Sequence, residues 1–388
     1  MLGVVIGALA LALAGCGDRK PRAAVVRLPQ LAAPTRGTTA SLTRRPPVTV
    51  YYHVPPLRNP HDVYAADTTI APVARHFRPL VYVPDTGSND VYEIDPRTYR
   101  VVRHFNVGAV PQHIVPSYDL RTLWVNNDIG NSLTAIDPVT GKPGRTIRVD
   151  DPYNLYLTPD GRYAMVMAEQ RRRIDFRDAQ TMRLRHELSV PMCAGINHAD
   201  FTANGRYMLV SCEFAPRMIV VDVPEQRVVK VVRLRPRASP QDVKLSSDGK
   251  TFYVADLTFG GLWVIGARHF RLHGFIRTGT GAHGLYPSRN SKFLYVSNRG
   301  AGTISVIRFA TKRIVATWHI PGGSPDMGNV SANGRVLWLS GRYDNSVYAI
   351  NTRTGKLIRR IPVGFQPHGL CVYPQPGRYS LGHTGVMR

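Results

Sequence analysis

Seven polar residues recur along the chain at almost equal distances, and four of them are histidines. Successive members are 41, 44, 44, 41, 43 and 42 residues apart. They are His113, Asn154, His198, Asp242, His283, Asp326 and His368. Histidine is the commonest metal ligand and transfers protons near neutral pH, and carboxylates can complete a metal site. If the fold brings these positions together, they could hold a metal ion or a polar ligand.

A second set of positions recurs with the same period, three residues past an apolar Val or Leu of a strand-like segment. Its members are Thr86, Asp128, Glu169, Glu213, Leu257, Arg299 and Arg342. Acidic residues follow one another in this order, and the two arginines come together at its end. A site built from both sets could hold a small ligand with an anionic group on the arginine side.

The elements that must position these residues form a repeat of about 42 residues. Each copy has an apolar strand with Tyr or Trp, a polar turn, and a second strand that ends near Ile-Asp, as at Leu80–Val83 and Ile94-Asp95. Further copies start at Leu123, Tyr163, Tyr207, Phe252, Leu294 and Leu337. Pairs such as Asp160-Gly161 and Asn204-Gly205 predict type I′ hairpins between strands. Seven such units predict an all-β, seven-bladed β-propeller of four-stranded antiparallel blades.

The two ends of the repeat are incomplete in complementary ways. The copy near Leu80 has no inner strand before it, and the last inner strand, Gly369 to Tyr373, has no blade after it. Pairing these two segments closes the ring and removes exposed sheet edges. In an antiparallel blade, both recurring sets then lie toward one face, so the first set is expected to ring one mouth of the central channel.

The segment Tyr295-Val296-Ser297-Asn298 resembles the signature of the YVTN family of bacterial and archaeal propellers. The resemblance covers about residues 78–375 and implies the propeller fold. It implies no single function, because that family spans surface-layer proteins, binding modules and relatives of haem- or quinone-linked enzymes.

The favoured interpretation is a non-enzymatic binding or scaffold protein whose His-rich channel mouth takes a protein or a small anionic ligand. The candidate ligand-binding residues are His113, His198, His283, His368, Asp242, Asp326, Arg299 and Arg342. In the structural alternative, the same residues cap backbone groups of the crowded inner strands or bind channel water.

An exported enzyme or a cofactor-handling protein remains the alternative function. His113 and His368 lie on adjacent predicted blades and are candidate ligands of a divalent metal ion. The chain is distantly similar to the propeller of dissimilatory nitrite reductases, which implies a tetrapyrrole; the chain has no C-x-x-C-H motif, so it would be non-covalent. Similarity to lyase and lactonase propellers implies His198 as general base with Glu213 as metal or substrate anchor.

The N-terminus predicts export and a lipid anchor. An uncharged apolar run ends in Leu13-Ala14-Gly15-Cys16, which resembles the lipobox of bacterial lipoproteins and implies lipidation of Cys16. The run is too short to span a bilayer. Gly17 favours the outer over the inner membrane, on the periplasmic side or at the surface. We expect a signal peptide at 1–16, a flexible Pro/Arg/Thr-rich tether at 17–65, the propeller at 66–376, and a tail at 377–388 with no role of its own.

The charge of +24 comes from 50 basic and 26 acidic residues. It could attract an anionic partner, or it could reflect habitat or codon usage. Nucleic acid is not an expected partner, because the chain is exported and has no basic-aromatic module. Cys193 and Cys212 flank the Asn204-Gly205 turn at nearly opposed positions and predict a disulfide, while Cys371 is expected to be a buried thiol. A monomer is expected.

Overall fold

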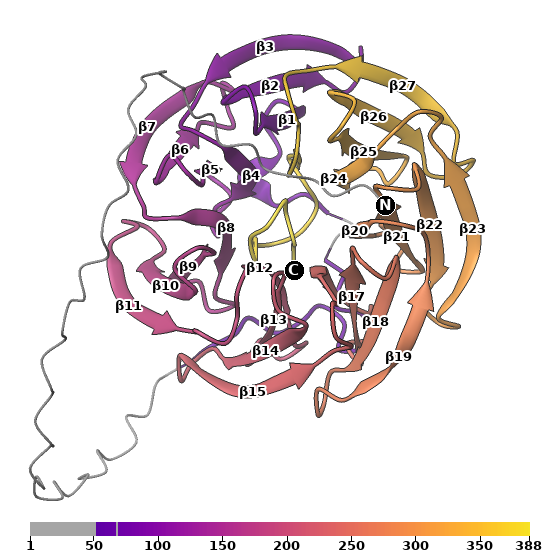
Figure 1. Ribbon diagram of the computed structural model, residues 1–388. Helices are drawn as coiled ribbons and strands as arrows, with labels where there is room; N and C mark the ends of the chain where they lie inside the picture. Colours follow the sequence, from indigo (N-terminus) through magenta and orange to yellow (C-terminus); the bar gives the residue numbers. More distant parts are fainter. Residues whose placement is uncertain (1–51, 67–68) are drawn as a thin grey trace, which may run out of the picture. The chain divides into compact units, whose positions relative to one another are not determined.

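The computed structural model describes residues 52–66 and 69–388 of the 388-residue chain. Seven four-stranded antiparallel sheets are arranged in a ring, as Figure 1 shows, and this confirms the predicted seven-bladed propeller. The predicted signal peptide, Cys16 and most of the tether lie outside the described residues and stay predictions. Within the described residues, no helix is long and apolar enough to cross a membrane.

Each blade runs from an inner strand at the channel to an outer strand at the rim. Blade 1 contains β28 (Cys371–Tyr373), β1 (Leu80–Asp85), β2 (Asp90–Asp95) and β3 (Arg100–Asn106). Blade 2 contains β4 (Pro111–Pro116), β5 (Leu123–Asn127), β6 (Ser132–Ile136) and β7 (Pro143–Arg148). Blade 3 contains β8 (Pro152–Leu157), β9 (Tyr163–Ala168), β10 (Arg173–Asp178) and β11 (Leu184–Ser189).

The remaining blades follow the same order along the chain. Blade 4 contains β12 (Ile196–Phe201), β13 (Tyr207–Cys212), β14 (Arg217–Asp222) and β15 (Arg227–Arg233). Blade 5 contains β16 (Pro240–Leu245), β17 (Thr251–Asp256), β18 (Gly261–Gly266) and β19 (Leu272–Arg277). Blade 6 contains β20 (Ala282–Pro287), β21 (Phe293–Asn298), β22 (Thr303–Arg308) and β23 (Arg313–His319). Blade 7 contains β24 (Pro325–Val330), β25 (Val336–Gly341), β26 (Ser346–Asn351) and β27 (Leu357–Pro362), and one short 3₁₀ helix, η1 (Pro72–Ala74), precedes β1.

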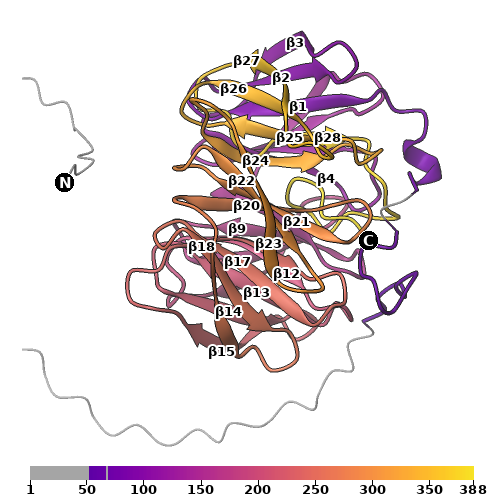
Figure 2. The ribbon, with the colours of Figure 1, turned by 90° about the vertical axis from the view of Figure 1, so that its right-hand side faces the viewer.

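The ring closes where the chain ends were expected to meet. Strand β28 pairs with β1, with Leu80 opposite Tyr373 and Tyr82 opposite Cys371. This pairing supplies the inner strand that blade 1 lacks, so the last repeat completes the first. Figure 2 shows β28 beside β1 in the side view.

Burial of the strands follows their distance from the channel. The inner strands β4, β8, β12, β16 and β24 are buried at every residue, whereas the outer strands β3, β7 and β15 are largely exposed. Apolar side chains of β9, β10, β13 and β14 fill the space between blades 3 and 4 in one cluster. A propeller buries both faces of its middle strands, which explains their near-continuous apolar sequences.

The hairpin turns differ from the predicted type I′ geometry. Gly161 and Gly205 have φ of 72° and 69°, but the preceding Asp160 and Asn204 are not among the residues with positive φ. The Gly161 amide donates to the Thr158 carbonyl at 2.8 Å, and the Asp160 carboxylate accepts from the Thr158 hydroxyl at 2.6 Å. The side-chain bond stabilises a longer turn in which only the glycine is left-handed.

The segment 52–66 lies against the propeller, so the predicted flexible tether does not extend to residue 65. Val63 and Tyr64 are 2% and 3% exposed and pack with apolar residues of blades 4 and 5. The hydroxyls of Tyr52 and Tyr64 donate to the Gly205 and Leu245 carbonyls at 2.7 and 2.6 Å. The tyrosines and apolar residues of this segment bury enough surface to order it.

The C-terminal tail enters the channel, and this outcome differs from the expected role-free extension. Leu381, His383 and Met387 are 2%, 1% and 1% exposed. The His383 amide donates to the Leu155 carbonyl at 2.8 Å, and the Arg388 guanidinium donates to Asp200 at 3.1 Å. In Figure 1 the yellow tail crosses the centre of the ring. The tail therefore closes one end of the channel with its own side chains.

Candidate functional site in the channel

The seven recurring polar residues converge on the channel interior. Six lie on the innermost strands of blades 2 to 7, and His368 lies just before β28. None is more than 2% exposed. We expected a ring at an open mouth; instead these side chains form a buried layer, because the tail covers them from one side and a second polar layer covers them from the other.

Two histidines of this layer form a compact group with a histidine of the tail. The ring centroids of His113, His198 and His383 are 5.3, 5.2 and 5.0 Å apart in the three pairs. One ring nitrogen of each lies within 4.8 Å of the others. His383 was not among the predicted site residues because it belongs to no repeat, and its only sequence signal was a histidine in a short tail.

One hydrogen bond orients the His113 ring, and its second ring nitrogen has no partner. Its Nδ1–H donates to the Tyr153 carbonyl at 3.0 Å, and its buried Nε2 has no hydrogen-bond partner. Gly369 lies against this ring, and a Cβ there would come within 2.2 Å of it. Both ring nitrogens of His198 also lack a partner. Burial holds the pKa of both imidazoles well below the usual value, and the neighbouring histidines act in the same direction.

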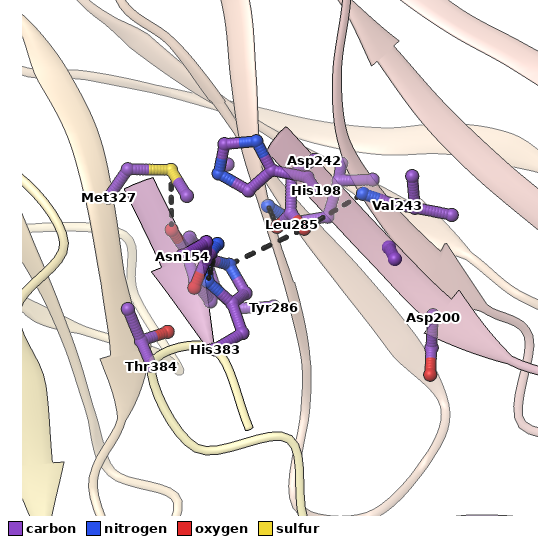
Figure 3. A network of polar contacts seen from close by, with 12 residues as sticks. Asn154, His198, Asp200, Asp242, Val243, Leu285, Tyr286, Met327, His383 and Thr384 are labelled. Carbon is purple, nitrogen blue, oxygen red and sulfur yellow. Dashed lines mark hydrogen bonds and ion pairs between the residues drawn. The ribbon is translucent and has the colours of Figure 1, made fainter. Parts of the chain in front are cut away.

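His383 makes two long polar contacts, which Figure 3 shows. Asn154 Nδ2 donates to its Nδ1 at 3.3 Å, and its Nε2 lies 3.5 Å from Asp242 Oδ1. Asp242 itself accepts the Val243 and Leu285 amides at 2.8 Å each, and so ties blade 5 to blade 6. Asn154 likewise accepts the Leu155 amide at 2.9 Å. These two residues therefore fulfil the capping role of the structural alternative.

The other two histidines are bound by Asp326. His283 Nδ1 and His368 Nδ1 lie 2.9 and 2.7 Å from its two oxygens, and Arg299 donates to it at 3.2 Å. Burial alone would raise the pKa of Asp326, but His283, Arg299 and His368 hold it well below its usual value. The predicted metal pair His113 and His368 has ring centroids 5.0 Å apart, yet His368 is committed to Asp326.

The second recurring set is less buried than the first: Thr86 and Asp128 are buried, and its other five members are half-buried. Tyr153 lies between the two layers, with its ring 5.3 Å from His113 and 5.8 Å from His198. Burial, followed by Glu213 and Glu169, raises the pKa of the Tyr153 phenol well above its usual value, and Arg342 opposes this. The phenol is therefore close to both the acidic side and the arginine side of the mouth.

The acidic side carries groups without partners. One oxygen each of Glu169 and Gln112 is buried and has no hydrogen bond, whereas Asp128 contacts the side chains of Asp151 and Gln112. Burial, with the negative charge of Glu213, raises the pKa of Glu169 to about 9, and burial with Asp151 raises that of Asp128 to about 7. At neutral pH Glu169 is thus largely protonated in the free protein.

The predicted catalytic pair His198 and Glu213 does not form. Glu213 accepts the Asn197 side-chain amide at 2.7 Å, whereas His198 has no side-chain partner. The pairing of β12 with β13 shifts register between Ile196 and Ala199, and in this bulge Asn197 takes the contact with Glu213 while His198 lies against the other channel histidines. The same blade holds the Cys193–Cys212 disulfide, with Cα atoms 4.9 Å apart. Cys371 is a buried free thiol, and burial raises its pKa.

The profile of the YNCE-like β-propeller family matches residues 60–377, which is most of the chain. The chain belongs to this family. Among the relatives of this YNCE-like propeller, the protein YncE of Salmonella typhi is 23% identical over 276 residues, which cover 64% of this chain and 74% of that protein.

Solved structures similar to this YNCE-like propeller share the fold at low sequence identity. Hydrazine synthase of Kuenenia stuttgartiensis superposes with a TM-score of 0.60 at 17% identity, over 74% of this chain and 99% of that chain. A putative 6-phosphogluconolactonase of Bacteroides uniformis superposes with a TM-score of 0.60 at 20% identity, over 76% and 99%. Such identities support the architecture and assign no activity.

Proposed function

We propose that this YNCE-like propeller is a binding protein of the cell envelope, anchored through Cys16, whose channel mouth takes a small molecule with an anionic group. The observation that carries the proposal is the polar layer above Tyr153, in which Glu213, Glu169 and Arg342 all lie close enough to shift the pKa of the phenol. One buried oxygen each of Glu169 and Gln112 in this region has no partner. Unpaired buried polar atoms cost stability, and a bound polar ligand would satisfy them.

The arginine side offers the anion contact. Arg342 makes one long hydrogen bond, to the Thr86 hydroxyl at 3.4 Å, so most of its donors are free for a ligand. Arg299 is held by Asp326 and lies 5.3 Å from the Tyr343 ring, which fixes its position. A carboxylate or phosphate group on Arg342 would therefore gain a charge-assisted hydrogen bond at low ordering cost.

The acidic side of the mouth would determine which other polar groups the ligand carries. A protonated Glu169 donates one hydrogen bond, and the unpartnered oxygen of Gln112 accepts another. A hydroxyl or amino group beside the anionic group would match this arrangement. The catalytic alternative has no equivalent support, since His198 and Glu213 do not contact each other.

A binding screen tests the proposal. Purified full-length protein is titrated with small hydroxy acids, amino acids and sugar phosphates, followed by thermal shift and calorimetry. We expect a bound compound to lose about tenfold or more in affinity in Arg342→Gln, because one charge-assisted contact is removed. Arg353→Gln, an exposed arginine, is the matched control. The proposal fails if no compound binds, or if both variants weaken binding equally.

The anchor is tested separately in cells. Labelled palmitate should enter the wild-type chain and not Cys16→Ser, and only the wild type should fractionate with membranes. Equal labelling of both chains would disprove the anchor and leave the channel proposal standing.

A further inference from the structure

We infer that His113, His198 and His383 form a binding site for one divalent transition-metal ion, such as Zn²⁺ or Cu²⁺. The site lies below Tyr153, away from the mouth, and it is independent of the anionic ligand that we propose at the mouth. It combines residues of two blades with a residue of the C-terminal tail. It also differs from the sequence-based pair His113 and His368.

The first support is the chemistry of the ring nitrogens. Nε2 of His113 and both ring nitrogens of His198 are buried without a hydrogen-bond partner in a cluster that is at most 1% exposed. Buried polar atoms in folded proteins are normally paired, so several bare nitrogens that face one another need an explanation. Lone pairs directed at a metal ion explain them, because imidazole nitrogen suits Zn²⁺, Cu²⁺ and Ni²⁺.

The second support is the spacing of the three rings. Their centroids are 5.0 to 5.3 Å apart. An ion about 2.0–2.1 Å from one nitrogen of each ring, in tetrahedral geometry, also places imidazole centroids about 5 Å apart. The nitrogens, within 4.8 Å of one another, need only move closer by small ring rotations. The set leaves a fourth coordination position for water or another ligand.

The third support is the set of groups behind the rings. The Tyr153 carbonyl accepts the Nδ1 proton of His113 at 3.0 Å, which keeps Nε2 unprotonated. Asp242 lies 3.5 Å from Nε2 of His383 and can hold that ring when Nδ1 leaves Asn154. Metal-binding histidines usually have such a carbonyl or carboxylate partner on their second nitrogen.

The remaining histidines explain why the site has three ligands and not five. His283 and His368 direct Nδ1 at Asp326, at 2.9 and 2.7 Å. Asp326 is also bound to Arg299. These two rings therefore have a partner of their own and form a wall beside the site, with His283 6.1 Å from His198 between ring centroids.

Metal titration of the full chain tests the site. Protein stripped with a chelator is titrated with Zn²⁺ alone, and then with Cu²⁺, by calorimetry and native mass spectrometry. We expect one ion per chain, and a loss of affinity of about 100-fold or more in His198→Gln and in His383→Gln. His273→Gln, an exposed histidine on β19, should bind as the wild type does and controls for surface histidines.

X-ray absorption of the zinc-loaded wild type counts the ligands without any variant, and three imidazoles are expected. The inference is overturned if the stripped protein binds no ion, if fewer than three imidazoles are found, or if both site variants bind as tightly as the control. None of these results would affect the anion-binding screen at Arg342, so failure of this site and failure of the proposed function can be told apart.

Discussion

The two halves of the buried histidine cluster differ in the partners of their ring nitrogens. On one side, His283 and His368 bind Asp326, whose charge is balanced by Arg299. On the other side, His113 and His198 keep bare ring nitrogens, although they occupy equivalent positions on their blades. The comparison teaches that the repeat places the side chains, while the partner of each decides whether it stabilises the fold or stays available for a ligand.

We expect the largest effect on stability from a substitution in the half of the cluster that is bound to Asp326. Asp326→Asn removes the charge that balances Arg299, whose side chain is 11% exposed. A buried cation without its partner is strongly destabilising, so we expect a loss of about 3–5 kcal/mol in the free energy of unfolding. Urea denaturation of both proteins measures it.

Asp150→Asn is the matched control, because Asp150 forms ion pairs only at the surface, at 3.6 to 3.8 Å. Exposed pairs contribute little, so a much smaller loss is expected. If Asp326→Asn costs no more than this control, then the Asp326 cluster does not stabilise the fold as argued.

Much of this arrangement follows from the period of the sequence. The spacing of His113, His198, His283 and His368 predicts that they share one level of a propeller, and the structure brings them into the channel. Their partners were not predictable in the same way, because a side chain's contacts depend on rotamers and on neighbouring blades. His198 and Glu213 belong to the two arms of one hairpin, yet Asn197 takes the hydrogen bond.

The tail shows a second limit of the repeat. His383 follows no periodic pattern, and nothing local requires residues 377–388 to enter the channel. The tail is held by contacts that are distant in sequence, such as Arg388 with Asp200 and the Leu381 carbonyl with the Leu157 amide. A pattern with period 42 cannot encode such contacts, so the third member of the histidine group appears only in the folded chain.

Asp85 is a buried carboxylate without a cationic partner, in contrast to Asp326. We therefore expect Asp85 to make the stability of the fold depend on pH. Asp85 is fully buried, and burial, with Asp90, raises its pKa to about 9, opposed only by a hydrogen bond from the Gly364 backbone. The unfolded value is about 3.9, so the folded state holds more protons between these values and its stability falls as pH rises from about 4 to about 9.

Asp85→Asn should remove this dependence. We expect the variant to match the wild type near pH 4 and to exceed it at pH 8 by on the order of 1–3 kcal/mol in unfolding free energy. Urea denaturation across this range measures both curves. Parallel curves would mean that Asp85 finds a partner for its charge in solution.

We expect the smallest effect on stability in the other half of the cluster, where ring nitrogens of His113 and His198 have no partner. In metal-free protein, His198→Leu removes two unpartnered nitrogens at similar side-chain volume, so the free energy of unfolding should change by less than about 1 kcal/mol. His368→Leu is the matched comparison, because it breaks the 2.7 Å contact with Asp326 and leaves that carboxylate short of a donor. Urea denaturation in the presence of a chelator should therefore separate the two variants, with His368→Leu the less stable. Equal losses would mean that His198 has a structural partner of its own, and the division of the cluster into a satisfied half and an available half would have to be abandoned.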